Sequence, residues 1–343
     1  MAISSKELAQ KLNLSPAAVS MALNNKPGVS EKTRQLVLAA AEQYGCTVPR
    51  RQESPAGGTI QFVIYKKHGE IVNDSPFFSQ LTEGINTGCR HAGFDLQISY
   101  FYEYKDRELQ MKALKESGCR GIILLGTEIS REFFEPFSRL STPMVVLDTY
   151  FEELDCDSIL INNVQGAFRA TSYLINNGLL KIGYLRSLYP IGNFAERADG
   201  YYKALRYHRV PSEHPYVHRL TPSVEGAYND MKRLILDGIE IADGYFSDND
   251  QIAAGAMRAF KEAGFRIPED ISFIGFDDMP ICECMDPPLT TMAVPKHYLG
   301  ELAVDRLIGK LRHPAPACIK TEISPRLLIR GSVNVRGDSH SVS

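Results

Sequence analysis

The sequence predicts a small all-α head joined to an α/β core of two lobes, each built on a parallel sheet. Residues 4–45 have the pattern of three short capped helices. From residue 59 onward, short apolar runs alternate with stretches of helical period, as in successive βα units. Between them, residues 47–58 contain two prolines and a Gly-Gly pair, which disfavour regular structure. We therefore expect a head at 1–46, a linker at 47–58 and a core at 59–340.

Each head helix has an identifiable start. Ser4 is followed three residues later by a glutamate, which is the pattern of a capping box. Ser15 is an N-cap residue with Pro16 at the first helical position, where its missing N–H costs nothing. Ser30 caps the third helix, and Gly45 suits its C-terminal end. The three helices form a helix-turn-helix pattern at the start of the chain.

Helical spacing divides the second helix into two faces. Val19, Ala22 and Leu23 lie at i, i+3 and i+4 and are expected to point inward. Their predicted core partners are Leu8, Leu12, Leu36, Val37 and Ala40. The predicted outward face carries Pro16, Ala17, Ser20 and Met21. An outward second helix indicates reading of a DNA major groove. Its Pro, Ala and Met side chains contact thymine methyl groups but form no bidentate hydrogen bonds, so we expect modest base readout.

Charge supports a nucleic-acid partner for the head. Residues 1–51 hold seven basic and three acidic residues, a formal +4, so residues 52–343 carry −7 of a chain whose total is −3. A basic head on an acidic body is expected when one end meets a polyanion. The alternative is a helical bundle that binds protein. The predicted DNA-binding residues are Ser4, Ser5, Ser15, Pro16, Ala17, Ser20, Met21, Asn24, Ser30, Thr33, Arg34, Arg50 and Arg51.

Composition narrows the class of protein. The 343 residues are 44% hydrophobic and 23% charged, and no apolar run approaches the roughly 20 residues of a membrane span. The N-terminus has no apolar signal segment, so we expect a cytoplasmic protein. Seven scattered cysteines are typical of reduced thiols. Cys282 and Cys284 could form a metal pair, but no further Cys or His lies close in sequence.

The core divides into two βα arrays. Strands are predicted at 60–65, 96–100, 121–126, 144–148 and 159–162, and helices near 77–92, 107–117, 131–140 and 166–177. The second array has strands at 182–185, 217–220, 244–247 and 271–277, and helices near 195–207, 224–236 and 249–263. We expect lobes at 59–161 and 162–290, with the chain crossing between them again near 290–325. Ligands bind outside the carboxyl ends of parallel strands, so the cleft between the lobes is the expected small-molecule site.

The chain resembles the LacI/GalR family of bacterial transcription regulators. In the head the resemblance rests on residues 15–24, 26–30 and 33–34. In the core it rests on DSPFF at 74–78, ERADGY at 196–201, FSDND at 246–250, residues 254–259, GFDD at 275–278 and PLTT at 288–291. These blocks follow in order across nearly all of residues 3–330. The resemblance implies a periplasmic-binding-protein-like (type I) core that senses a small molecule, and a homodimer whose two heads bind a pseudo-palindromic operator.

The resemblance also implies effector-binding positions. They are Phe77, Phe78, Asn162, Asn193, Arg197, Leu220, Asn249 and Asp277. An Arg and an Asp facing each other across a cleft supply donors and an acceptor that suit vicinal hydroxyls, and an aromatic rim suits a sugar or base ring. Structural roles are the alternatives: an interlobe salt bridge for Arg197, a strand-end cap for Asp277, a helix N-cap for Asn249, and core contacts for the two phenylalanines.

We therefore predict an effector-responsive, operator-specific repressor, of carbohydrate-utilisation genes, that is not an enzyme and uses no cofactor or metal. The effector is expected to be a sugar or sugar derivative. Alternatives are a DNA-binding regulator without a small-molecule effector, or one with a protein corepressor.

Two departures from the family limit how far its DNA-binding properties can be assigned to this chain. Residues 49–58 lack the leucine with which family hinges wedge the minor groove, and Met21 stands where a polar reader is frequent, so operator preference cannot be transferred.

Overall fold

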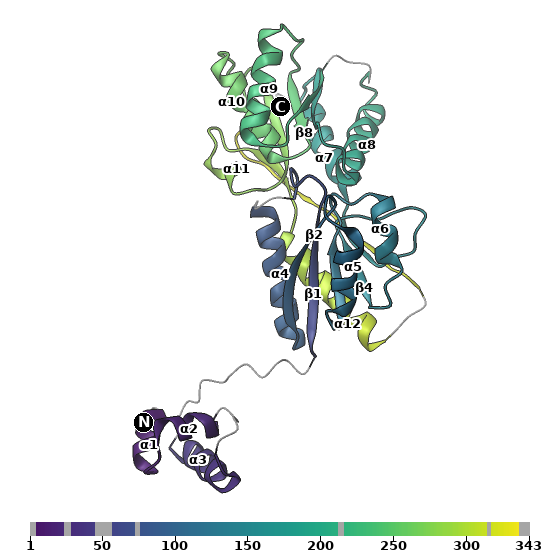
Figure 1. Cartoon of the computed structure of the whole chain (residues 1–343). Coiled ribbons are helices and arrows are strands. Elements are labelled where there is room, and N and C mark those ends of the chain that lie inside the picture. Colours follow the sequence, from purple (N-terminus) through teal and green to yellow (C-terminus); the bar gives the residue numbers. More distant parts are fainter. Residues whose placement is uncertain are drawn as a thin grey trace, which may run out of the picture. The chain divides into compact units, whose positions relative to one another are not determined.

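The structure is a computed structural model that describes residues 5–23, 29–44, 57–72, 76–211, 216–313 and 317–335 (Figure 1). It divides into two compact units, Met1–Ala56 and Gly57–Ser343, which we call the head and the core. Four predicted DNA-binding residues lie outside the described residues: Ser4, Asn24, Arg50 and Arg51. The predicted capping box, the helix end at Gly45 and most of the linker lie outside them too.

The head has three helices, α1 (Ser5–Lys11), α2 (Pro16–Leu23) and α3 (Glu31–Gln43). The Ser15 hydroxyl accepts a hydrogen bond from the Ala18 N–H at 3.1 Å. The Ser30 hydroxyl accepts one from the Thr33 N–H at 3.2 Å. Both satisfy a backbone donor that the first turn of a helix leaves unpaired. The predicted caps of the second and third helices are confirmed.

The head core differs from the prediction at one helix face. The buried residues are Leu8, Ala9, Val19, Ala22, Val37, Ala40 and Ala41, with Leu12, Leu23 and Tyr44 partly buried against them. Val19 and Ala22 therefore point inward as predicted, but Leu36 is 54% exposed, so its place in the core was wrong. The buried face of α3 runs through Val37, Ala40 and Ala41, and Leu36 is rotated about 100° from its neighbour Val37.

The first lobe is built on a six-stranded sheet in the order β11-β5-β4-β3-β1-β2, with every neighbouring pair parallel. Its strands are β1 (Thr59–Lys66), β2 (Asp95–Tyr102), β3 (Gly121–Leu125), β4 (Met144–Leu147), β5 (Ser158–Ile161) and β11 (Lys320–Ile323). Its helices are α4 (Pro76–Ala92), α5 (Arg107–Glu116), α6 (Arg131–Ser138) and α12 (Lys296–Arg312). Buried residues of α4 and α12 pack on one face of the sheet, and those of α5 and α6 on the other.

The second lobe has a sheet in the order β12-β10-β9-β8-β6-β7, in which the β10–β12 pair is antiparallel and the other pairs are parallel. Its strands are β6 (Ile182–Ser187), β7 (Val217–Leu220), β8 (Gly244–Ser247), β9 (Ser272–Asp277), β10 (Thr290–Ala293) and β12 (Arg326–Leu328). Its helices are α7 (Asn163–Asn176), α8 (Gly192–Tyr207), α9 (Val224–Leu236), α10 (Asp250–Glu262) and the short α11 (Ile281–Cys284). Figure 1 shows α7 and α8 on one side of this lobe and α9 and α10 on the other.

The chain passes between the lobes three times. It leaves the first sheet after β5, returns from β10 to α12, and leaves again between β11 and β12. All nine strands predicted from apolar runs are present, with ends shifted by at most two residues. The prediction did not identify α11, α12 or the last three strands, β10 to β12. The second sheet therefore gains an antiparallel edge strand that the predicted all-parallel lobe lacked.

The returning helix α12 is fixed to the first lobe by close packing and by buried charge. A Cβ added at Gly84 of α4 would lie 2.0 Å from the His297 carbonyl oxygen, so only glycine allows these helices to approach this closely. Asp157, 1% exposed, accepts hydrogen bonds at 2.6 Å from Arg306 Nε and from Lys310 Nζ. Residues more than 200 positions apart thus belong to one rigid lobe.

Candidate functional site: an interlobe cleft

A pocket lies between the lobes of the core. It encloses about 550 Å³ of space between atoms, its open mouth included. Its lining residues are Ile71, Phe77, Phe78, Thr127, Asp148, Ile161, Ile191, Asn193, Phe194, Arg197, Pro222, Asn249, Asp250, Gln251, Asp277 and Met279. Asp148 follows β4, and Asp277 ends β9. The pocket therefore sits at the carboxyl ends of the strands, as predicted for parallel sheets.

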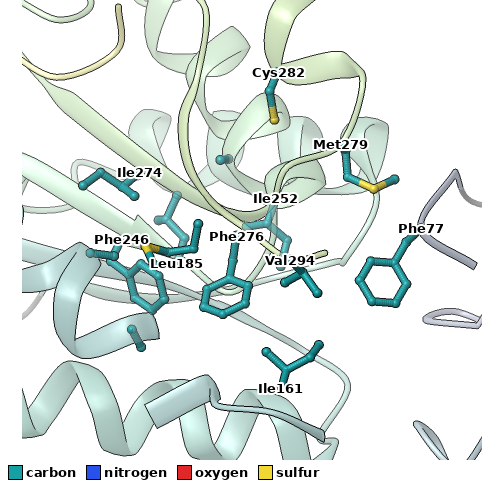
Figure 2. Close-up of a cluster of buried hydrophobic side chains, with 14 of the residues drawn as sticks. Phe77, Ile161, Leu185, Phe246, Ile252, Ile274, Phe276, Met279, Cys282 and Val294 are labelled. Carbon is teal, nitrogen blue, oxygen red and sulfur yellow. The ribbon is translucent and has the colours of Figure 1, made fainter. Parts of the chain in front are cut away.

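Apolar side chains form part of this boundary between the lobes. Figure 2 shows Phe77, Ile161, Phe276 and Met279 in one cluster of buried side chains. The Phe77 and Phe78 rings meet edge to face, with centroids 5.0 Å apart. Phe77 is 8% exposed and belongs to the core, and it also lines the pocket. The core and ligand interpretations of Phe77 are therefore compatible.

Arg197, on α8, is the most constrained charged side chain in the pocket. It is 3% exposed, and its Nε donates to Asn163 Oδ1 at 2.9 Å. One terminal nitrogen donates to the Asp248 carbonyl oxygen, and the other to Asp277 Oδ1 at 3.1 Å. The guanidinium carbon lies 3.7 Å from the centroid of the Phe276 ring. A buried guanidinium needs such partners to offset its desolvation, so Arg197 holds the ends of β8 and β9 together.

The strand ends at the pocket have unusual backbone conformations. Asp148, Asp277 and Asp278 have positive φ angles of 68°, 104° and 56°, a region that few residues other than glycine adopt. The ammonium group of Lys296, a side chain 4% exposed, donates to the carbonyl oxygens of Asp277 and Asp278. These bonds hold the Asp277-Asp278 turn in place. Backbone strain of this kind clusters at binding sites.

The first lobe contributes a buried carboxyl group to the pocket. Asp148 Oδ2 accepts a hydrogen bond from the Thr127 hydroxyl at 2.6 Å, and the Asn193 side chain of the second lobe lies close enough to lower the pKa of Asp148. The pKa of Asp148 is raised to about 6, chiefly by burial; the hydrogen bonds and Arg197 oppose the rise, and the nearby Asp277 adds to it. The Asp148–Asn193 contact joins the two lobes inside the pocket.

Asp250 adds a third carboxyl group to the pocket lining. Its oxygens accept hydrogen bonds from the Thr291 hydroxyl at 2.6 Å and from the Met279 N–H at 2.7 Å. Burial raises the pKa of Asp250 to about 7, and the charge of Asp277 acts in the same direction. Arg197 is the only Lys or Arg among the lining residues of the described chain. The pocket therefore has more acidic than basic groups.

The structure places six of the eight predicted effector-binding residues in the pocket lining, namely Phe77, Phe78, Asn193, Arg197, Asn249 and Asp277. Asn162 lies elsewhere: its side chain accepts from the Gln165 N–H at 2.9 Å and caps α7. Leu220 is 0% exposed in the core at the end of β7. Asn249 lines the pocket, and its side chain also caps α10 by accepting from the Ile252 N–H.

The expected arrangement of Arg197 and Asp277 on opposite sides of the cleft was wrong. Both belong to the second lobe, where they form a direct ion pair with a nitrogen–oxygen distance of 3.1 Å. The alternative of an interlobe salt bridge fails for the same reason. The Asp277 carboxylate is thus already engaged, and the acidic residue on the opposite lobe is Asp148.

Sequence reasoning did not identify Thr127, Asp148, Asn163 or Asp250 as residues of the site or its support. Asp148 and Thr127 could have been found, because Asp148 is the last residue of one predicted strand and Thr127 directly follows another. Asn163 could not, because a neighbouring asparagine, Asn162, gave the same signal. Only the turn into α7 places Asn163 beneath Arg197 and Asn162 at the cap.

In the head, the predicted reading face is open where the structure describes it. Ser15, Pro16, Ala17 and Ser30 are exposed, and Met21 is partly exposed. Thr33 and Arg34, in the first turn of α3, are also partly exposed. Ser5 and Ser20 lie in α1 and α2, but their side chains are outside the described part of the chain.

Comparisons with known proteins agree with this architecture. Residues 171–333 match the model of the periplasmic binding protein-like domain. The HTH-type transcriptional repressor PurR of Mannheimia succiniciproducens is 29% identical over 96% of this chain and 98% of its own. A LacI family regulator from Enterococcus faecium with bound ribose is 27% identical, with a TM-score of 0.69 over 81% of this chain and 99% of its own. The lac repressor dimer bound to operator and the anti-inducer ONPF shares the fold, at 23% identity and a TM-score of 0.70 over 97% and 99% of the two chains.

A helix-turn-helix head joined to a two-lobed core with an interlobe pocket defines an effector-responsive, DNA-binding transcriptional regulator. The relatives in sequence are transcriptional repressors, and the neighbours in structure include LacI family regulators, in agreement with the resemblance seen in the sequence. None of the helices in the described ranges has the length and apolar character needed to cross a bilayer.

The raised pKa of Asp148 predicts a pH-dependent stability. The folded state holds this proton up to a pH of about 6, whereas the unfolded carboxyl loses it near its ordinary value of 3.8. Stability therefore falls as the pH rises through this window, and ionised Asp148 destabilises the fold at pH 7.5. Asp148→Asn keeps an oxygen for Thr127 and should raise stability at pH 7.5, on the order of 2 kcal/mol. Thermal unfolding between pH 4.5 and 7.5 checks this: the variant should show a shallower pH dependence, and equal slopes would contradict it.

Proposed function

We propose that this chain is a repressor of carbohydrate-utilisation genes, released from or recruited to a pseudo-palindromic operator when the core binds an uncharged sugar or nucleoside. The observation that carries this proposal is the pocket's charge: its single guanidinium group is paired with Asp277, while Asp148 and Asp250 add further carboxyl groups. Within the described part of the chain, the lining supplies fixed acceptors and amide groups but no cation other than the paired Arg197.

The ligand class follows from this charge distribution. A phosphate or carboxylate would need Arg197 to abandon Asp277, and it would then lie beside buried acids with no compensating charge. The hydroxyl groups of a neutral ligand would instead donate to the carboxylates and accept from the amides of Asn193 and Asn249. The pocket therefore suits a polyol. Phe77, Phe78 and Phe194 offer apolar ring faces to a sugar or base. The names of the relatives, among them a ribose operon repressor and a ribose-bound regulator, fit this class.

The head reads DNA through the exposed face of α2. Pro16 and Ala17 are exposed at the start of that helix, the end that contacts base edges in helix-turn-helix proteins. Ser15, Ser30, Thr33 and Arg34 lie at the starts of α2 and α3, where hydroxyls, backbone N–H groups and a cation suit phosphate oxygens. Met21 supplies an apolar contact. The DNA-binding role of these residues, and of Ser4, Ser5, Ser20, Asn24, Arg50 and Arg51, is part of this proposal.

A homodimer would cover an exposed strand of the first lobe. The strand β2 is an edge of its sheet, and its residues Ile98 and Tyr100 are 45% and 47% exposed. An exposed eight-residue edge strand with large apolar side chains requires a partner to avoid nonspecific association. A second copy of the chain meets this need and brings two heads to one operator, as in the lac repressor dimer.

An effector panel tests the proposed ligand class. We expect heat of binding or thermal stabilisation with at least one neutral compound among D-ribose, D-glucose and cytidine. Ribose 5-phosphate, glucose 6-phosphate and glucuronate should be bound at least tenfold more weakly than their neutral counterparts. Asp277→Asn should lose effector binding while keeping operator affinity within about threefold, because the head is a separate unit. Tight binding of a phosphorylated member would contradict the charge argument.

Two substitutions in the protein test the head assignment. Each variant is assayed on operator DNA selected from a random pool of sequences. Met21→Arg should change the preferred sequence, because Arg makes bidentate contacts with guanine that Met cannot. Arg34→Ala should weaken binding to all sequences about equally and lower the salt slope by about one. A changed sequence preference in Arg34→Ala would show that the face assignment is wrong.

The proposed interface is tested by sedimentation of Ile98→Asp. A buried carboxylate without a partner is costly, so this variant should be monomeric at micromolar concentration and bind operator far more weakly. Leu109→Asp is the matched control, since Leu109 is 67% exposed on helix α5 and is not part of the edge strand β2. A dimeric Ile98→Asp protein would remove β2 from the interface.

A further inference from the structure

A second set of contacts joins the lobes beside the pocket. The residues after β4, Asp148 to Tyr150, lie against the first turns of α8. Thr149 Oγ1 lies 3.9 Å from the position a Cβ would take on Gly192. The next residue, Tyr150, has its hydroxyl close enough to the Glu196 carboxyl group for each to shift the pKa of the other. Two successive residues of the first lobe, Thr149 and Tyr150, thus lie against α8, the helix that carries Arg197.

Tyr150 is fixed on its own lobe. The Lys320 ammonium nitrogen lies 3.7 Å from the centroid of the Tyr150 ring, and Lys320 belongs to β11 of the first sheet. Burial raises the pKa of the Tyr150 phenol, and the charge of Glu196 and then that of Glu152 act in the same direction. A neutral hydroxyl therefore lies beside a carboxyl group of the other lobe.

Asn163 connects Glu196 to the pocket by hydrogen bonds. The Asn163 amide nitrogen donates to Glu196 Oε2 at 2.9 Å and is 3.2 Å from Asn193 Oδ1. The Asn163 amide oxygen accepts from Arg197 Nε at 2.9 Å. One amide thus connects Glu196 with two residues of the pocket lining. Tyr150, Glu196 and Asn163 are not themselves among the lining residues.

We propose that Tyr150 and Glu196 are positioning residues, which tie the lobes together outside the pocket and orient Arg197 and Asn193 through Asn163, so that they set effector affinity without touching the effector. The charge and hydroxyl contacts that choose the effector lie in the pocket itself. Loss of the Tyr150–Glu196 pair therefore weakens binding of every cleft ligand by a similar factor and leaves their order unchanged. The effect on effector binding rests on the proposed function, whereas the contact between Tyr150 and Glu196 does not.

The test compares Tyr150→Phe, Glu196→Gln and the double variant in the full chain. Tyr189→Phe is the matched control: Tyr189 also meets the opposite lobe, but through its ring, 4.7 Å from the His68 ring, which phenylalanine retains. Calorimetric titration uses D-ribose, D-glucose and cytidine at a temperature well below unfolding. Amide hydrogen exchange of residues 148–150 and 192–197, without any ligand, measures the contact directly.

Each single variant should weaken binding of any bound neutral compound by about three- to tenfold, and the double variant should be no weaker than the poorer single one. The order of the compounds should not change, and Tyr189→Phe should match the wild type. A purely structural role would lower the melting temperature and leave these dissociation constants unaltered, which would overturn the proposal, as would additive losses.

If the wild type bound none of the compounds, the proposed effector class would fail. Exchange in 148–150 and 192–197 would then decide alone: faster exchange in Tyr150→Phe supports the contact, and unchanged exchange refutes it.

Discussion

The buried guanidinium of Arg197 is the constraint on which the site depends. A charge with 3% exposure is stable only when its donors are used, and here they are used by an amide of α7, a carbonyl after β8 and the carboxylate that ends β9. Three separate elements of the second lobe are therefore fixed relative to one another. Because the donors of Arg197 are already used, the guanidinium is not open to an anionic ligand. The same hydrogen bonds therefore determine both the geometry of the site and its expected ligand class.

The first lobe completes the pocket from the opposite side. Asp148 approaches Asn193 within the pocket, and Tyr150 approaches Glu196 outside it. Both contacts meet the beginning of α8, the helix that carries Arg197. A ligand between the lobes bonds to groups whose positions depend on how the lobes meet, and this gives it different affinities for different lobe arrangements. Such a difference is the physical requirement for a ligand to control a distant head.

Local pattern predicted most of the fold. Apolar runs located the first nine strands, because a strand covered on both faces leaves a continuous hydrophobic signal. The last strands, such as β11 with its alternating half-exposed residues, have no such signal. Six pocket residues followed from the family resemblance, but the choice between Asn162 and Asn163, the burial of Leu220 and the shared lobe of Arg197 and Asp277 depend on tertiary packing. Asp148 becomes part of the site only when two lobes distant in sequence are brought together.

The most direct test is a mass-spectrometric search for a small molecule that remains bound to the purified full-length protein, compared with Arg197→Lys. Lysine keeps the positive charge but cannot serve Asn163, Asp248 and Asp277 together. The account predicts that the wild type releases an uncharged, hydroxyl-rich compound in stoichiometric amount, and that the variant retains much less of it. Stoichiometric recovery of a phosphorylated or carboxylated compound from the wild type, or equal recovery from both proteins, would contradict it.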